Sequence, residues 1–108
     1  MATIEELTDN NFKQNVLESK DVVVVDFWAQ WCGPCRKLTP LLEQIQSELQ
    51  DGVKIYKIDA DKNINSAKEY GISSLPTVLI FKDGEAKEIM VGMMQKSTII
   101  SNIKKYLA

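Results

Sequence analysis

One segment of the chain, residues 21–28, restricts the fold more than any other. Its sequence is DVVVVDFW, and both of its alternating faces are largely apolar. A strand that is apolar on both faces is covered on both sides, which is typical of the centre of an α/β sheet. Asp26 is therefore unusual, because alternation places its carboxylate on the same face as Val24 and Trp28.

The other apolar patterns predict a single domain over residues 1–108. Further strands are expected at Thr3–Leu7, Val53–Asp59, Thr77–Lys82 and Lys87–Val91. Helices are expected after a cap at Thr8 or Asp9 (with Phe12, Val16 and Leu17 on one face), at Pro34–Gln50, at Asn63–Tyr70 and at Thr98–Leu107. Strand, helix and strand in succession favour a parallel pair, and Asp83-Gly84 favours an antiparallel hairpin. We therefore expect an α/β fold with a mixed sheet of about five strands.

The composition excludes several kinds of site. The chain has no histidine, so its own residues cannot supply Ser-His-Asp or Cys-His catalysis, and two cysteines cannot close a tetrahedral zinc site. Its 13 basic and 15 acidic residues give no attraction to nucleic acids or anionic membranes. No apolar run is long enough to span a bilayer, and residues 1–9 do not resemble a signal peptide. We expect no metal, no nucleic acid, no membrane and a cytoplasmic location.

The two cysteines, Cys32 and Cys35, follow the apolar strand and open an expected helix. The first turn of a helix has unpaired N–H groups and the positive end of the helix dipole, which stabilise an anion. The pKa of the Cys32 thiol should therefore fall. A spacing of three places Cys35 one turn further on the same side, close enough to bond to Cys32. Pro34 suits an early helix position, where its missing N–H costs nothing.

Three other interpretations of this cysteine pair exist. They are a structural disulfide, half of a metal site that another chain completes, and two ordinary buried cysteines. A disulfide closing so short a loop stabilises the fold by only about 2 kcal/mol through chain entropy, and a reducing compartment would not keep it oxidised. The interpretation that we favour is a redox-active dithiol.

The sequence resembles the thioredoxin family along essentially its whole length. The residues that carry the resemblance are the run Asp26–Cys35 (DFWAQWCGPC), Pro40, Lys57, Asp59, Asp61, Pro76-Thr77, Asp83-Gly84 and Gly92. The resemblance implies a thioredoxin fold, with a five-stranded mixed sheet flanked by four helices. It also implies a general protein-disulfide reductase that needs no cofactor of its own and is recharged by a thioredoxin reductase. We expect a cytoplasmic monomer that takes part in electron transport and cell redox homeostasis by acting on disulfide-containing target proteins.

The resemblance also suggests a role for each residue near the cysteines. Cys32 would attack a target disulfide and Cys35 would resolve the mixed disulfide, while Gly33-Pro34 between them would tune the redox behaviour. Asp26, with a pKa raised by burial, would accept the proton of Cys35, and Lys57 would be its partner. The alternatives are that Asp26 reaches water at the end of its strand and that Lys57 is an ordinary solvated strand lysine.

A docking surface for target proteins is expected beside the cysteines. The resemblance implies that the peptide bond before Pro76 is cis and faces the cysteines, where it would expose backbone groups to an extended substrate; from the residues alone, Pro76 is a turn before a strand. The residues expected in an apolar docking rim are Trp31, Gly33, Pro34, Ile72, Leu75, Gly92 and Met93. Alternatively, Met93 and Met94 are core methionines. Gly92 suggests a close approach of backbone near the site.

Two functions other than a reductase fit the same sequence. One is an oxidase or isomerase of the same fold, which a reduction potential would distinguish. The other is a binding or scaffold subunit that uses the rim without turnover, in which case a double Cys→Ser variant would keep its function.

Overall fold

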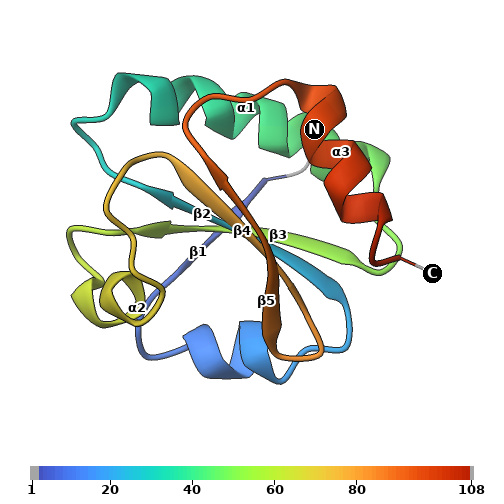
Figure 1. Ribbon diagram of the computed structural model, residues 1–108, viewed down its shortest axis with the longest axis horizontal. Coiled ribbons are helices and arrows are strands. Elements are labelled where there is room, and N and C mark those ends of the chain that lie inside the picture. Colours follow the sequence, from blue (N-terminus) through green and yellow to red (C-terminus); the bar gives the residue numbers. More distant parts are fainter. Residues whose placement is uncertain (1–2, 108) are drawn as a thin grey trace.

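Residues 22–28 form the central strand of a five-stranded mixed sheet in the computed structural model, which describes residues 3–107 (Figure 1). The elements are β1 (Glu5–Leu7), η1 (Lys13–Leu17), β2 (Val22–Trp28), α1 (Gly33–Glu48), β3 (Val53–Asp59), α2 (Ile64–Glu69), β4 (Thr77–Lys82), β5 (Glu85–Val91) and α3 (Lys96–Lys104). Three α-helices and the short helical turn η1 flank the sheet. The expected α/β architecture, with four helical segments around five strands, is therefore confirmed.

The strands lie in the order β1-β3-β2-β4-β5. β3 is parallel to both of its neighbours, β1 and β2, whereas β4 is antiparallel to β2 and β5 is antiparallel to β4. The parallel pair β2–β3 is joined through α1, as expected for a strand-helix-strand unit. Because β2 has a strand on each side, its carboxyl end lies near the middle of one edge of the sheet, and the chain continues from there into α1.

Two hydrophobic cores cover the two faces of β2. Val22 and Val24 pack with residues of α1 and α3, which lie on one side of the sheet. Val23, Val25 and Phe27 pack with residues around η1 and α2 on the other side. All five side chains are completely buried. The apolar pattern of β2 therefore reflects a strand that is covered on both faces.

The expected cap of the first helix is wrong, and the helical segment itself is short. It is a single wide turn, η1, closed by a hydrogen bond from the N–H of Glu18 to the carbonyl of Lys13 at 3.1 Å, and no side chain caps it. The carboxylate of Asp9 instead accepts hydrogen bonds from the N–H and the hydroxyl of Ser66, at 2.8 and 2.6 Å, and from the N–H of Asn65 at 3.3 Å. Asp9 is thus a cap for α2, brought to it by tertiary folding.

The Asp83-Gly84 turn connects β4 and β5 as predicted. Both residues have positive φ, 53° and 79°, which is the requirement of a tight hairpin turn whose twist matches that of the strands. Strand pairing resumes immediately after the turn, with Glu85 opposite Lys82, so β5 begins two residues earlier than expected. A side chain at position 84 would also meet the backbone, because a Cβ there would lie 2.8 Å from the carbonyl oxygen of Leu17.

Candidate active site

The cysteines lie where β2 ends and α1 begins. Cys32 is the N-cap of α1 and has extended backbone, with φ −90° and ψ 106°. Its N–H donates to the carbonyl of Ala29 at 3.1 Å, and its Sγ accepts the N–H of Cys35 at 3.2 Å. Pro34 is in the first turn of the helix, where no backbone N–H is required. The sulfur of Cys32 therefore sits among the unpaired N–H groups at the start of α1.

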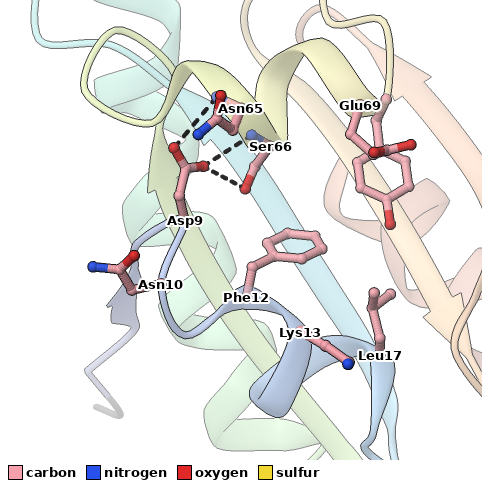
Figure 2. A pocket seen from close by; sticks show the side chains of 9 residues that line it. Asp9, Asn10, Phe12, Lys13, Leu17, Asn65, Ser66 and Glu69 are labelled. Carbon is pink, nitrogen blue, oxygen red and sulfur yellow. Dashed lines mark hydrogen bonds between the residues drawn. The ribbon is translucent and has the colours of Figure 1, made fainter.

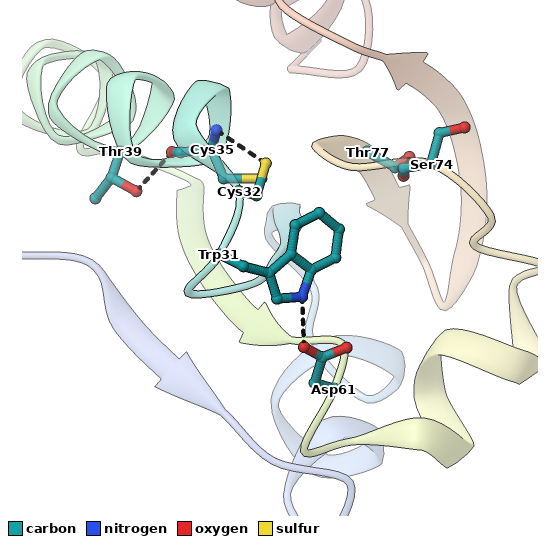
Figure 3. The surroundings of a disulfide bond; sticks show 7 residues. All are labelled: Trp31, Cys32, Cys35, Thr39, Asp61, Ser74 and Thr77. Atoms are coloured by element: carbon teal, nitrogen blue, oxygen red, sulfur yellow. Dashed lines mark hydrogen bonds between the residues drawn. A yellow bond between two sulfur atoms is a disulfide. The ribbon is translucent and has the colours of Figure 1, made fainter.

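Cys32 and Cys35 are joined by a disulfide, so the structure is the oxidised form (Figure 3). Their Cα atoms are 5.3 Å apart, as one helical turn allows. Cys35 is completely buried and Cys32 is 4% exposed. The expected bond between the two cysteines is confirmed, and of the two it is Cys32 that has some contact with solvent.

The loop before β4 packs against the disulfide. Leu75 contacts the small cluster that Ala29 and the two cysteines form, and the Leu75–Pro76 peptide bond is cis, as the family resemblance implied. The carbonyl of Pro76 accepts a hydrogen bond from the N–H of Gly92 at 2.8 Å. Segments of the chain around residues 32, 75 and 92 are thereby brought together at one edge of the sheet.

Asp26 is a carboxyl group buried without a hydrogen-bond partner. Its side chain is completely buried, and neither oxygen accepts a hydrogen bond from the part of the chain that the structure describes. Alternation along β2 places it on the face covered by α1, the helix that carries Cys35. Burial raises its pKa to about 7, although the positive charge of Lys57 lowers it. The alternative of a carboxylate reaching water at the strand end is therefore wrong.

Lys57 lies opposite Asp26 in the register of β2 and β3. Its side chain is partly buried rather than fully solvated. The ammonium nitrogen lies 5.1 Å from the ring centroid of Trp28, in a cation–π contact. Trp28 itself packs against the cysteine cluster. The charge of Lys57 thus acts on two neighbours: it lowers the pKa of Asp26, and it interacts with the ring of Trp28, which packs next to the disulfide.

The residues expected in the docking rim are exposed to different degrees. Trp31 is 69% exposed and Met93 is 51% exposed, whereas Ile72, Leu75 and Gly92 are partly buried. A shallow pocket of about 400 Å³ runs beside the disulfide loop, and its lining includes Trp31, Ile72 and Leu75. The structure therefore brings the larger apolar rim residues from distant parts of the sequence to the neighbourhood of the cysteines.

The sequence did not reveal what fixes the exposed Trp31. Its indole Nε1 donates to Oδ2 of Asp61 at 2.7 Å (Figure 3). Asp61 is held in turn, because its N–H donates to Oδ1 of the buried Asp59 at 2.9 Å. One signal was available: Asp61 follows β3 and Trp31 follows β2, and parallel neighbours end at the same edge of a sheet.

Gly92 approaches the backbone of Pro76 as expected, through the 2.8 Å hydrogen bond, and the two methionines that follow it differ in exposure. A Cβ at Gly92 would meet nothing within 4 Å, so lack of space does not require a glycine there. The requirement comes from its φ of +83°, which side chains disfavour. Of the two adjacent methionines, Met94 is partly buried against the core beneath α1 and α3, whereas Met93 is exposed. Only Met94 fits the alternative of a core methionine.

A larger pocket lies elsewhere. It measures about 540 Å³, and its lining includes Asp9, Phe12, Lys13 and Tyr70 but no residue of the disulfide or the docking rim (Figure 2). Of its two carboxylates, that of Asp9 is bonded to the start of α2, and that of Glu69 is exposed. The residues that line this pocket include no cysteine.

Two structural features are absent from residues 3–107. No group of three or more cysteine or carboxylate side chains there could hold a metal ion. No helix in the same range is long and apolar enough to cross a membrane.

The chain is similar to known thioredoxins over almost its full length. The sequence model of a family described as Thioredoxin matches residues 3–105. A thioredoxin of Rickettsia prowazekii is 47% identical over 102 residues, which cover 94% of this chain and 97% of that protein. A thioredoxin of Synechocystis sp. is 43% identical over 107 residues, which cover 99% of this chain and all of that protein.

Proposed function

The chain belongs to the thioredoxin family, and we propose that its cysteine pair transfers electrons to the disulfides of other proteins in a reducing direction. It is a protein-disulfide oxidoreductase that uses a reversible Cys32–Cys35 dithiol. The observation that carries the proposal is the disulfide at the start of α1, with Cys32 as the helix cap and slightly exposed.

The reaction proceeds by two thiol–disulfide exchanges. In the first, the thiolate of Cys32 attacks a target disulfide, forms a mixed disulfide and releases one target thiolate. In the second, the thiolate of Cys35 attacks Sγ of Cys32, and the second target thiolate leaves. The target disulfide has then gained two electrons and two protons, and the Cys32–Cys35 pair has lost them. The end state is the oxidised form that the structure describes.

The helix terminus favours the first exchange. Lowering the pKa of a thiol by one unit raises its thiolate fraction by up to about tenfold but lowers its intrinsic reactivity about threefold, for a Brønsted slope of about 0.4–0.5. The net gain in attack by Cys32 is therefore only about threefold. In the second exchange Cys32 supplies the sulfur that is attacked and the target thiolate is the leaving group, so stabilising the Cys32 thiolate does not speed that step. The start of α1 thus accelerates capture of the target.

Asp26 serves as the proton acceptor in the second exchange. Cys35 is completely buried and must lose a proton before it attacks. Asp26 is buried on the side of the sheet that α1 covers, and its pKa of about 7 lets it gain and lose a proton near neutral pH. Lys57 acts through Asp26 as a positioning residue, because its charge keeps that pKa from rising further.

The target protein docks on the apolar rim beside the disulfide. The rim residues are Trp31, Gly33, Pro34, Ile72, Leu75, Gly92 and Met93. Since the carbonyl of Pro76 is already bonded to Gly92, an extended target would pair with backbone groups that precede Pro76. The exposed ring of Trp31 adds the large apolar area typical of a docking contact.

Each turnover leaves a disulfide that must be reduced again. A thioredoxin reductase is the partner that would supply these electrons. We place the protein in the cytoplasm, where disulfides do not persist without a catalytic role, as a monomer that is one domain over residues 1–108. Its work there is electron transport to disulfide-containing target proteins, and hence cell redox homeostasis.

Reduction of insulin disulfides tests the proposal. The unmodified protein should accelerate insulin precipitation in the presence of dithiothreitol, and its measured reduction potential should be reducing. Cys32→Ser should abolish the acceleration, whereas Cys35→Ser should trap a mixed disulfide with the target, visible as a heavier band on a non-reducing gel. Undiminished activity of Cys32→Ser, or a strongly oxidising potential, would overturn the proposal.

A further inference from the structure

Three methionines lie close together in the sequence at the end of β5 and differ in environment. Met90 is 9% exposed, and its Sδ accepts a hydrogen bond from Nδ2 of Asn102 at 3.2 Å. Met94 is partly buried against the core beneath α1 and α3. Met93 is 51% exposed. Among these three side chains, Met93 is the one that a small oxidant in solution reaches most easily.

Met93 also stands beside the residues that surround the disulfide. Its neighbour Gly92 donates the 2.8 Å hydrogen bond to the carbonyl of Pro76. Leu75, on the other side of the cis bond, packs against the cysteine cluster. Met93 therefore directly follows a residue that is hydrogen-bonded to the loop beside the disulfide. A chemical change at Met93 would alter the docking rim while the sulfurs of the disulfide remain as they are.

We propose that Met93 is a modification site, at which hydrogen peroxide converts the thioether to a sulfoxide and thereby weakens the docking of target proteins. The sulfur of Met93 loses two electrons and forms an S–O bond. The O–O bond of the peroxide breaks, and water leaves. The inference rests on the proposed function, because it treats Met93 as part of the surface on which targets dock.

The expected effect follows from the polarity of the product. A sulfoxide is a strong hydrogen-bond acceptor, whereas a thioether is a flexible apolar group. Docking would have to strip water from this acceptor on an otherwise apolar rim, and an acceptor buried without a partner weakens binding. We expect the KM for a protein target to rise about five- to tenfold. The kcat should change little, since Cys32 and Cys35 are not modified.

The experiment treats the disulfide form with hydrogen peroxide, because cysteines in a disulfide are protected from further oxidation. Catalase then removes the peroxide, and dithiothreitol restores the dithiol but not the methionine. Met90, Met93 and Met94 share one tryptic peptide, residues 88–96, so fragment ions in tandem mass spectrometry must assign the sulfoxide. KM and kcat for insulin are measured before treatment, after it, and after incubation with methionine sulfoxide reductases.

Two variants make the comparison specific. Met93→Leu should show no rise in KM between its own treated and untreated samples, whereas Met94→Leu should show the same rise as the unmodified protein. Met93→Gln, which places a polar amide on the rim without oxidation, should raise KM in the untreated protein.

The outcomes separate this inference from the proposed function. Oxidation at Met90 or Met94 ahead of Met93, or a Met93 sulfoxide without a rise in KM, would overturn the inference alone. An untreated protein that does not reduce insulin would instead refute the proposed function. Recovery of the original KM by the sulfoxide reductases would establish that the modification is reversible.

Discussion

Asp26 and Lys57 occupy paired positions on neighbouring parallel strands, yet the carboxylate of Asp26 accepts no hydrogen bond from residues 3–107. The ammonium of Lys57 lies over the ring of Trp28 instead. Its charge still lowers the pKa of Asp26, but burial has the larger effect and raises that pKa to about 7. Because burial disfavours the charged carboxylate, the ionisation of Asp26 affects both the stability of the fold and the transfer of a proton from Cys35.

Asp26→Asn should stabilise the protein in a pH-dependent manner. Between pH 4 and pH 7 the folded protein holds a proton on Asp26 that the unfolded chain has released, so stability falls as pH rises in this window and is level above it. The difference between about 7 and the ordinary 3.8 corresponds to an upper limit of roughly 4 kcal/mol. Since a buried amide without partners offsets part of this gain, we expect about 2–4 kcal/mol at pH 8.5 and little at pH 4.

Urea unfolding of the oxidised protein at the two pH values measures this gain. The exposed Asp51, in the turn before β3, provides the matched control, and Asp51→Asn should change stability by less than about 0.5 kcal/mol at both. An equal gain from Asp26→Asn at pH 4 and pH 8.5 would show that the titration of Asp26 is not its cause.

The same variant should slow the second exchange. If Asp26 takes the proton of Cys35, the rate of mixed-disulfide resolution rises with pH as the carboxyl group ionises around its pKa of about 7. In Asp26→Asn this rise with pH should be absent. Resolution of the mixed disulfide should be about tenfold slower than in the unmodified protein at pH 8, with a smaller difference at pH 6. Rapid-quench measurement of a preformed mixed disulfide reports the step directly. A rate and profile equal to those of the unmodified protein would exclude Asp26 from the mechanism.

The strands could be predicted from the sequence because their limits are local. The bounds of β3 and β4 agree with the expectation, since Asp51-Gly52 precedes one and Asp83-Gly84 follows the other. Alternation placed Asp26 on a covered face of its strand but left open a carboxylate that reaches water at the strand end, and the complete burial of Asp26 excludes that alternative. The pairing of Cys32 with Cys35 followed from their spacing on one helix.

What could not be predicted depends on contacts between distant residues. Asp9 is a helix cap, as its residue type suggested, but the helix that it caps begins more than fifty residues later. The hydrogen bond from Trp31 to Asp61 joins residues that are thirty positions apart in the sequence. Both side chains are exposed, so no pattern of apolar residues indicates that they meet. In both cases the partner is determined by the order of the strands, and that order is a property of the whole sheet.

Asp61→Ala should weaken target docking by releasing Trp31. Without its 2.7 Å hydrogen bond the indole is free to reorient, and ordering such a side chain again on docking costs about 0.5–1.5 kcal/mol. We expect KM for insulin to rise roughly two- to tenfold with little change in kcat. Asp61→Asn, which keeps an acceptor oxygen, should restore most of the loss. A fall in kcat with unchanged KM would show that the bond does not serve docking.

Substitutions at Gly84 and Gly92 allow the cost of backbone strain to be measured separately from the cost of steric overlap. Both have positive φ, +79° and +83°, which costs a residue with a side chain about 1–2 kcal/mol. A Cβ at Gly92 meets nothing within 4 Å, so Gly92→Ala should lower stability by that amount alone. A Cβ at Gly84 would lie 2.8 Å from the carbonyl oxygen of Leu17, which is backbone and cannot rotate away, so Gly84→Ala should cost clearly more. Equilibrium urea unfolding ranks the two variants, and equal losses would mean that the η1 segment shifts to make room without penalty.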